Sequence, residues 1–259
     1  MGTSEEQPST SAIGHLLDEI SYEGNAKKYR GGGLGLENVL TTEVFSALDF
    51  LPRQAFLGEV LDSCHGADAH RLAVSSTVEV ATLDILPGDI QPVLDDGHDA
   101  PWQIQPDVLI ETAESICLVE AKRIRRSYFQ QQQIARTTQT ILHLATGRPG
   151  FVLFVLGAPP PVPVAKMNRI DFAEALEVGL GQQGIHWSAS RTRRVINEYI
   201  AWTTWEEISR RVSDAAGSYP SADPAVKASI SRLALSVASS VTMVTPHQNP
   251  TGHAARVNV

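Results

Sequence analysis

Apolar residues recur at helical spacing in the segment that begins at Leu36, where they can line one face of a helix. The residues at this spacing are Leu36, Val39, Leu40, Val44, Phe45, Leu48 and Leu51. Pro52 interrupts the pattern, and a second helical piece is predicted around Phe56, Leu57, Val60 and Leu61. Further helices are predicted at residues 12–20, 171–182, 205–215 and 224–240. A longer helix is expected from Ser127, read as an N-cap with Gln130 as its capping-box partner, to about Thr146.

Short runs of β-branched and apolar residues predict the strands of a sheet. These runs are residues 76–86, 108–111, 115–122, 151–156 and 194–203. Residues 151–156 are entirely apolar, which is typical of a strand buried on both faces. The segments 21–35 and 87–105 are rich in turn-forming residues and are expected to be loops. The order of elements predicts an α/β fold with a mixed central β-sheet flanked by helices.

The overall composition fits one globular domain, since 42% of the 259 residues are hydrophobic and 19% are charged. The domain is predicted at residues 12–240, with disordered tails at 1–11 and 241–259. The sequence has neither a secretory signal nor an apolar run of bilayer length, so a cytoplasmic protein without membrane contact is expected. The two cysteines, Cys64 and Cys117, are too few for a zinc site or a disulfide framework, and Cys117 is expected to be buried.

Three charged residues stand at the ends of two predicted strands. If residues 108–111 and 115–122 form a hairpin closed at Ala113-Glu114, paired residue numbers add up to 227, and Asp107 lies opposite Glu120. Facing side chains in such a pair have Cβ atoms about 5 Å apart, and Lys122 points to the same face as Glu120. Ala-Glu is not a favoured two-residue turn, and a register shifted by one residue would send the two acids to opposite faces.

Two carboxylates about 5 Å apart repel by roughly 3 kcal/mol at an effective dielectric constant of 20, and a divalent cation between them would reverse the sign of this interaction. Oxygen ligands in small number suit Mg²⁺, with Mn²⁺ as a substitute. A metal ion held by Asp107 and Glu120 would activate a water molecule and stabilise the charge on a phosphate. Lys122 could orient that water or offset charge on the phosphate.

At these residues the sequence resembles the PD-(D/E)XK nuclease superfamily. Pro106-Asp107 matches the PD element, and Glu120-Ala121-Lys122 matches the (D/E)XK element. The resemblance implies a restriction-endonuclease-like core, metal ligation by Asp107 and Glu120, and a catalytic Lys122. It also implies a metal role for Glu37, on the helix before the sheet, and a site role for Gln133. Gln133-Ile134 fits the start of a Gln-apolar-x-x-Tyr motif, but Thr137 stands in the place of the tyrosine.

The distribution of charge favours a polyanionic partner, although the net charge of −8 alone argues mildly against one. No Asp or Glu occurs from Ala121 to Ile170, while this stretch and the region after it carry Lys122, Arg123, Arg125, Arg126, Arg136, Arg148, Lys166, Arg169, Arg191, Arg193 and Arg194. Contacts to nucleic acid are expected from Arg123, Arg125, Arg126 and Arg136, because a phosphodiesterase needs cations beside its metal site.

The sequence therefore predicts a Mg²⁺-dependent nuclease that acts on DNA. The alternatives are a nucleic-acid-binding or protein-interaction module that keeps the fold without catalysis, and an RNA-directed hydrolase. At the level of residues, the alternative is an exposed salt-bridge cluster at a sheet end, with Glu37 as a first-turn helix acid and Gln133 as a solvated residue. A homodimer is compatible with this prediction, since enzymes that cut both strands are commonly dimers. Trp202 and Trp205 are interpreted as core residues.

Overall fold

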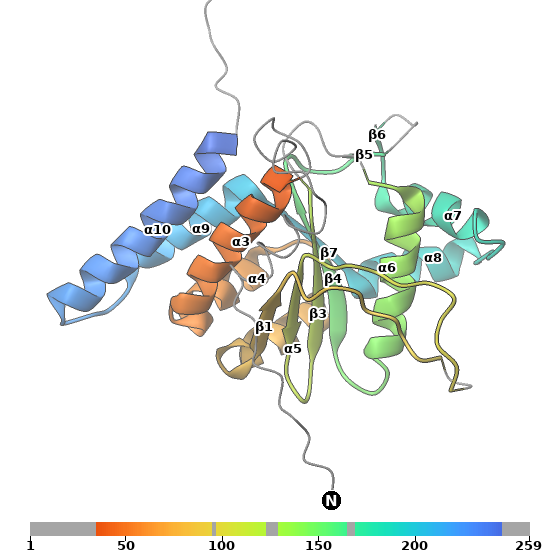
Figure 1. Ribbon diagram of the computed structural model, residues 1–259, viewed down its shortest axis with the longest axis horizontal. Coiled ribbons are helices and arrows are strands. Elements are labelled where there is room, and N and C mark those ends of the chain that lie inside the picture. The colour runs from red at the N-terminus through yellow and green to blue at the C-terminus, as the bar shows by residue number, and fades with distance from the viewer. Residues whose placement is uncertain (1–34, 95–96, 123–128, 165–168, 245–259) are drawn as a thin grey trace, which may run out of the picture.

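The computed structural model describes residues 35–94, 97–122, 129–164 and 169–244 (Figure 1). The predicted helix at 12–20 and nearly all of the predicted loop at 21–35 lie outside these residues. The helical elements are α3 (Gly35–Phe50), the π-helical turn η1 (Gln54–Gly58), α4 (Glu59–Ser63), α5 (Asp68–Thr77), the 3₁₀ turn η2 (Val78–Val80), α6 (Gln131–Leu144), α7 (Phe172–Gly181), α8 (Ala189–Tyr199), α9 (Trp205–Ser218) and α10 (Pro224–Val244). Among the described helices, none has the length and apolarity that crossing a bilayer requires.

A mixed sheet of five strands forms the centre of the fold, as predicted. Its strands are β1 (Thr82–Ile85), β2 (Val108–Glu111), β3 (Ile116–Ala121), β4 (Gly150–Leu156) and β7 (Ile200–Thr204), in the spatial order β1-β2-β3-β4-β7. The pairs β1–β2 and β2–β3 are antiparallel, whereas β3–β4 and β4–β7 are parallel. A separate pair joins β5 (Val162–Pro163) to β6 (Arg169–Ile170).

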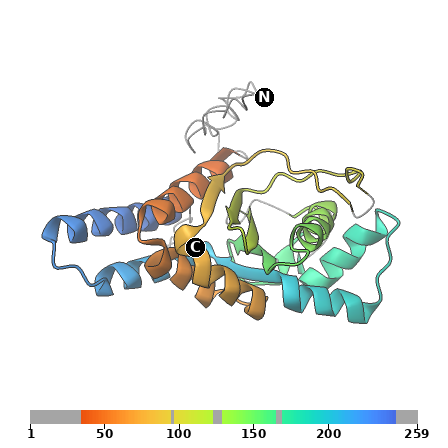
Figure 2. The same cartoon turned by 90° about the horizontal axis from the view of Figure 1, so that it is seen from below.

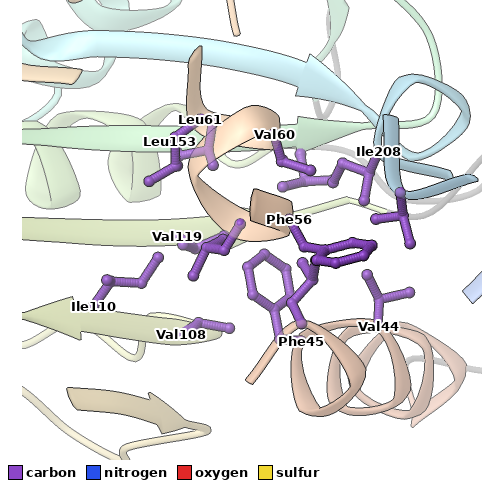
Figure 3. Close-up of a cluster of buried hydrophobic side chains, with 14 of the residues drawn as sticks. Val44, Phe45, Phe56, Val60, Leu61, Val108, Ile110, Val119, Leu153 and Ile208 are labelled. Carbon is purple, nitrogen blue, oxygen red and sulfur yellow. The ribbon is translucent and has the colours of Figure 1, made fainter. Parts of the chain in front are cut away.

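Helices cover both faces of the sheet, because side chains of β3 and β4 alternate between two apolar cores. Cys117, Val119 and Ala121 belong to the core that α3, α4 and α9 share, and Figure 3 shows Phe45 and Phe56 packed there against the sheet. Ile116 and Leu118 point to the other core, with residues of α6, α7 and α8. Figure 2 shows α6 and α3 on opposite sides of the strands. Every residue of β4 is buried, as its apolar run predicts.

Two predicted strands are helical in their N-terminal parts. In the segment 76–86, α5 extends to Thr77 and η2 follows, so that only residues 82–85 form a strand. In the segment 194–203, the chain is helical to Tyr199 and extended only from Ile200. Val195 and Ile196 look like strand residues in isolation, but Thr192, Val195 and Tyr199 recur at helical spacing. The Ser188 hydroxyl accepts a hydrogen bond from the Arg191 amide and caps this helix.

The helix predicted to start at Ser127 begins at Gln131, and Ser127 itself lies outside the described residues. Gln130 is the N-cap of α6 rather than a residue inside the first turn, so the predicted capping box is wrong. With φ of −85° and ψ of 132°, Gln130 is extended and ends any helix that approaches it from the N-terminal side. The helix predicted at 224–240 continues to Val244.

Close packing of α7 on α6 depends on Gly179. A Cβ atom at this position would lie 2.0 Å from the Gln131 carbonyl oxygen, which is backbone and cannot rotate away. We expect Gly179→Ala to lower the free energy of unfolding by about 1–3 kcal/mol in urea denaturation, despite the higher helix propensity of alanine. Gly217→Ala in α9 is the matched control, because a Cβ atom added there would meet nothing within 4 Å, and it should be neutral or stabilising. Equal effects of the two substitutions would contradict this packing.

Candidate active site

The β2–β3 hairpin has the register that the sequence predicts. Val108 pairs with Val119 and Glu111 with Ile116, so paired residue numbers add up to 227. The Ala113-Glu114 turn is held by Thr112, whose side-chain oxygen accepts hydrogen bonds from the Glu114 and Ser115 amides at 3.1 and 2.9 Å. This hydroxyl-stabilised turn explains why a sequence that does not favour a two-residue turn still fixes the register.

Asp107 lies directly before β2 and is tied to the end of β3 by two hydrogen bonds. Its amide donates to the Val119 carbonyl at 2.9 Å, and its Oδ2 accepts a hydrogen bond from the Ala121 amide at 2.6 Å. The first bond departs from the ladder by one residue, because Val119 is the partner of Val108 in the strand register. The second places the Asp107 carboxylate beside the Ala121 amide, between Glu120 and Lys122 in the chain, while the strand register ends at Val108 and does not pair Asp107 with Glu120.

Glu120 is a buried carboxylate held by two side chains of α6. It is 1% exposed, and it accepts hydrogen bonds from Gln133 Nε2 at 2.7 Å and from Thr137 Oγ1 at 3.1 Å. Burial raises the pKa of Glu120 to about 8; Lys122 and Thr137 oppose this change, and the charge of Asp107 adds to it. The burial excludes the alternative of an exposed salt-bridge cluster at this position.

Lys122 follows β3 and lies between carboxylates from two parts of the chain. Its Nζ donates to Glu37 Oε1 at 3.1 Å and to the Ala121 carbonyl at 2.9 Å, and lies 4.0 Å from Glu120 Oε2. Burial alone would lower the pKa of Lys122, but the charges of Asp107, Glu37 and Glu120 outweigh it and raise the pKa above its usual value. Lys122 is therefore a protonated cation at neutral pH.

Glu37 belongs to the site through Lys122. It lies in the first turn of α3, is 7% exposed, and forms the ion pair with the Lys122 ammonium. Figure 1 shows that α3 and α6 both begin at the same end of the sheet, which is how helices from opposite faces reach one site. The sequence indicates Glu37 as a site residue; its contact here is with the lysine, while its predicted role as a metal ligand stays a prediction.

The charges of the site fit a divalent cation. Glu37, Asp107 and Glu120 bring three carboxylates against the single ammonium of Lys122, which leaves a net charge of −2 when all four groups are ionised. Within the described part of the chain, no three His, Cys, Asp or Glu side chains are close enough together to form a metal cluster. Two carboxylates suffice for Mg²⁺, which keeps several water ligands, and metal ligation by Asp107 and Glu120 stays a prediction.

The described arginines of the predicted basic zone lie in separate parts of the fold. Arg148 lies at the turn of the hairpin, where it pairs with Glu111 at 2.6 Å and with the Thr112 carbonyl at 3.0 Å, at the opposite end of β2 from Asp107. Arg169 donates to the carbonyls of Pro159 and Pro161. Arg136 lies on α6, between Gln133 and Thr137 in sequence. The predicted contacts Arg123, Arg125 and Arg126, as well as Lys166, lie outside the described residues.

The site contains two residues whose roles the sequence did not predict. Thr137 stands in the place of a tyrosine in the sequence motif, yet its hydroxyl reaches Glu120 directly. Trp205 is fully buried, as expected of a core residue, but its Nε1 also donates to the Lys122 carbonyl at 3.1 Å. The four-residue spacing of Gln133 and Thr137 was the available signal, because it places both side chains on one face of a helix.

Removal of the Thr137 hydroxyl should change the pKa of Glu120, while the replacement of threonine by valine keeps the shape of the side chain. In Thr137→Val, one oxygen of a buried carboxylate loses its donor, so we expect the pKa of Glu120 to rise further and the onset of the cleavage activity proposed below to move to higher pH. At neutral pH we expect the rate to fall roughly tenfold. Gln132→Ala, at an exposed position of the same helix, is the control and should leave the pH–rate profile unchanged. Superimposable profiles for Thr137→Val and the wild type would contradict a positioning role.

Comparison with known proteins finds no matching family model, no similar curated protein and no similar solved structure. The residues of the site are therefore the basis on which function is inferred.

Proposed function

We propose that the chain is a magnesium-dependent nuclease that hydrolyses phosphodiester bonds, with DNA as the expected substrate. The observation that carries this proposal is the convergence of Asp107, Glu120 and Lys122 at one end of the sheet, where the carboxylates are in excess. A buried excess of negative charge destabilises a fold unless a cation or protons offset it. Oxygen donors beside a lysine suit a phosphate substrate and the metal ion that accompanies it.

Asp107 and Glu120 would hold the magnesium ion, which when bound supplies a Lewis acid and lowers the pKa of a nearby water molecule. Hydrolysis forms a bond between the water oxygen and phosphorus, breaks one P–O ester bond, and delivers a proton to the leaving oxygen. The Lys122 ammonium can donate a hydrogen bond to the attacking water or to a phosphate oxygen. Gln133 and Thr137 fix the Glu120 carboxylate, and Glu37 fixes the lysine.

The order of elements also supports a restriction-endonuclease-like core. A helix with an acidic residue in its first turn precedes the antiparallel β1-β2-β3, and α6 then connects β3 to the parallel strand β4. The resemblance to the PD-(D/E)XK superfamily implies this order. It also implies that the two acids and the lysine stand on two paired strands or at their ends; Glu120 lies in β3, Asp107 directly before β2 and Lys122 directly after β3.

Arg136 supports a polyanionic substrate. Its Nε is buried and, within the described part of the chain, has no hydrogen-bond partner. Leaving such a donor unmet costs about 1–3 kcal/mol, a cost that charge-assisted hydrogen bonds between the rest of the guanidinium and a phosphate would offset. Side chains lean toward the N-terminus of their helix, and the N-terminus of α6 is the end that contacts Glu120. A phosphate near Gln133 would therefore lie within reach of Arg136.

Cleavage of plasmid DNA tests the proposal. We expect the wild-type protein to nick or linearise plasmid with Mg²⁺ or Mn²⁺ and not with EDTA. Asp107→Asn and Lys122→Ala should each lower the rate at least about a hundredfold, because each removes one charged group from the site. Glu114→Gln, on the exposed turn of the same hairpin, is the control and should cleave like the wild type. Equal cleavage by all four proteins would refute this site, and degradation of RNA alone would correct the substrate.

A further inference from the structure

The corner between α7 and α8 contains a cavity outside the proposed active site. Its volume is about 310 Å³, and its lining residues are Glu177, Leu180, Ile185, His186, Trp187 and Ala189. Sites for small organic ligands begin at roughly 300 Å³, so this cavity suits a single flat ring system. Leu180, Ile185 and Trp187 supply apolar walls, whereas Glu177 and His186 supply polar groups.

An arginine side chain lies over the ring of Trp187 at this cavity. The Arg191 guanidinium lies over its ring, with Cζ 4.5 Å from the ring centroid. Guanidinium planes and aromatic rings such as indole are side-chain surfaces on which nucleobases stack. A base that enters the cavity would extend the existing Trp187–Arg191 stack. The Glu177 carboxylate could accept a hydrogen bond from its exocyclic amino group.

Three arginines follow the cavity along the exposed side of α8. Arg191, Arg193 and Arg194 are exposed, and none of them forms an ion pair within the described residues. Five arginines elsewhere in the described chain do pair with a carboxylate, namely Arg53, Arg71, Arg148, Arg210 and Arg211. The α8 arginines are thus available for phosphate groups, which is the charge complement that a polynucleotide needs.

The corner packs on the core and is connected to the active site through α7. Ile185 and Trp187 pack against the core that also includes Phe129, Phe154 and Phe172. Phe172 begins α7 and lies against Phe129, over whose ring the Lys122 ammonium is placed at 5.4 Å. The cavity is at the other end of this ten-residue helix, about 15 Å along its axis. An unpaired strand at the active site could follow α7 to the cavity.

We propose that the α7–α8 corner binds single-stranded nucleic acid, with one base in the cavity against Trp187 and phosphates on the arginines of α8. A single strand fits better than a duplex, because bases within a duplex are stacked and paired and cannot enter a pocket. The proposal deepens the proposed function, on which it rests for the class of ligand, and it makes single-stranded DNA or a single-stranded end the preferred substrate.

Fluorescence anisotropy with a labelled dC 12-mer in EDTA tests the proposal without cleavage. We expect Trp187→Ala to weaken binding between about fivefold and a hundredfold, the range for the loss of one base–aromatic stack, and to have no effect on an abasic 12-mer of equal length. Trp187→Phe, which retains a ring, should bind nearly as well as the wild type. Unchanged binding of the dC 12-mer by Trp187→Ala, or equal losses with both oligonucleotides, would overturn the base contact.

The arginines are tested by a pair of double variants with equal changes of charge. Arg193→Ala/Arg194→Ala should weaken binding of both 12-mers and reduce the slope of log affinity against log salt by about 1.4. Arg210→Ala/Arg232→Ala, on α9 and α10, should change affinity less than twofold. These exposed substitutions keep the test decisive if Trp187→Ala fails to fold, since equal effects of the two pairs would overturn the proposal. If the wild-type protein binds the 12-mers as expected but shows no Mg²⁺-dependent cleavage, only the proposed nuclease activity is refuted. If the protein cleaves DNA and both the Trp187→Ala and the Arg193→Ala/Arg194→Ala variants bind normally, only the proposed binding site at the α7–α8 corner is refuted.

Discussion

Glu120→Gln is expected to abolish metal-dependent cleavage and, at the same time, to stabilise the metal-free protein at alkaline pH. The substitution keeps the shape of the side chain and its position beside Gln133 and Thr137. It removes the negative charge, and with it a ligand that the proposed magnesium site needs. We expect the cleavage rate to fall at least about a hundredfold, as for a group that acts in the transition state.

The gain in stability follows from the pKa of Glu120, which burial raises from its ordinary value of 4.5 to about 8. The folded protein therefore binds a proton more tightly than the unfolded chain. In metal-free wild-type protein, the free energy of unfolding is unaffected by this group below about pH 4.5, falls as the pH rises from there to about 8, and is level above that. The loss is on the order of a few kcal/mol. The glutamine of the variant cannot ionise and escapes this loss.

Urea denaturation in EDTA at pH 5 and pH 8.5 measures this difference. The other titrating groups are common to the wild type and the variant. The change with pH in the difference between their free energies of unfolding therefore reports on Glu120. We expect the variant to gain on the wild type by a few kcal/mol between the two pH values. Added Mg²⁺ should then stabilise the wild type at pH 8.5 and leave the variant unchanged. A constant difference across pH would contradict the raised pKa of Glu120, and an equal response of both proteins to Mg²⁺ would contradict its role as a metal ligand.

How far the sequence determines this site depends on the range of the interactions involved. The register that places Asp107 beside Glu120 is encoded locally, because a hairpin turn and period-two alternation fix it within about fifteen residues. The ion pair between Glu37 and Lys122 joins residues 85 positions apart, and spacing alone could not reveal it. Only the order of elements that the resemblance implies points to Glu37.

The strand predictions failed where short apolar runs fit two periods equally well. Val78 and Val80 alternate like strand residues, yet Val80 is 79% exposed, and the chain there continues from α5 as η2. Val195 and Ile196 suggested a strand, but Val195 faces the core from α8 and the strand begins at Ile200. In both segments the conformation depends on how the helix packs against the sheet. The sequence of a few neighbouring residues does not reveal that packing.

Trp205→Ala is expected to have the largest effect on stability of any single substitution in the site region. Trp205 is fully buried at the junction of β7 and α9, in the core shared by α3, α4 and α9. Truncation would leave a large cavity, and we expect the free energy of unfolding to fall by about 3–5 kcal/mol. Thermal or urea denaturation measures this loss. A loss below about 1 kcal/mol would contradict the packing of this core.

Trp205→Phe separates the hydrogen bond of Trp205 from its volume, and Trp202→Phe is the matched control. The indole of Trp205 donates to the Lys122 carbonyl, whereas Trp202, in the preceding strand β7, stacks on His65 with ring centroids 4.2 Å apart. Trp205→Phe removes the hydrogen bond that holds the backbone at Lys122, so we expect the cleavage rate to fall roughly tenfold. We expect the free energy of unfolding to fall by about 1–3 kcal/mol. Trp202→Phe should lose little activity. Because Trp205 contacts the backbone of Lys122 rather than its ammonium, the defect should lie in kcat, with KM nearly unchanged. Equal activity of the two variants would mean that Trp205 serves only the core and that the position of Lys122 is fixed by β3 and Glu37 alone.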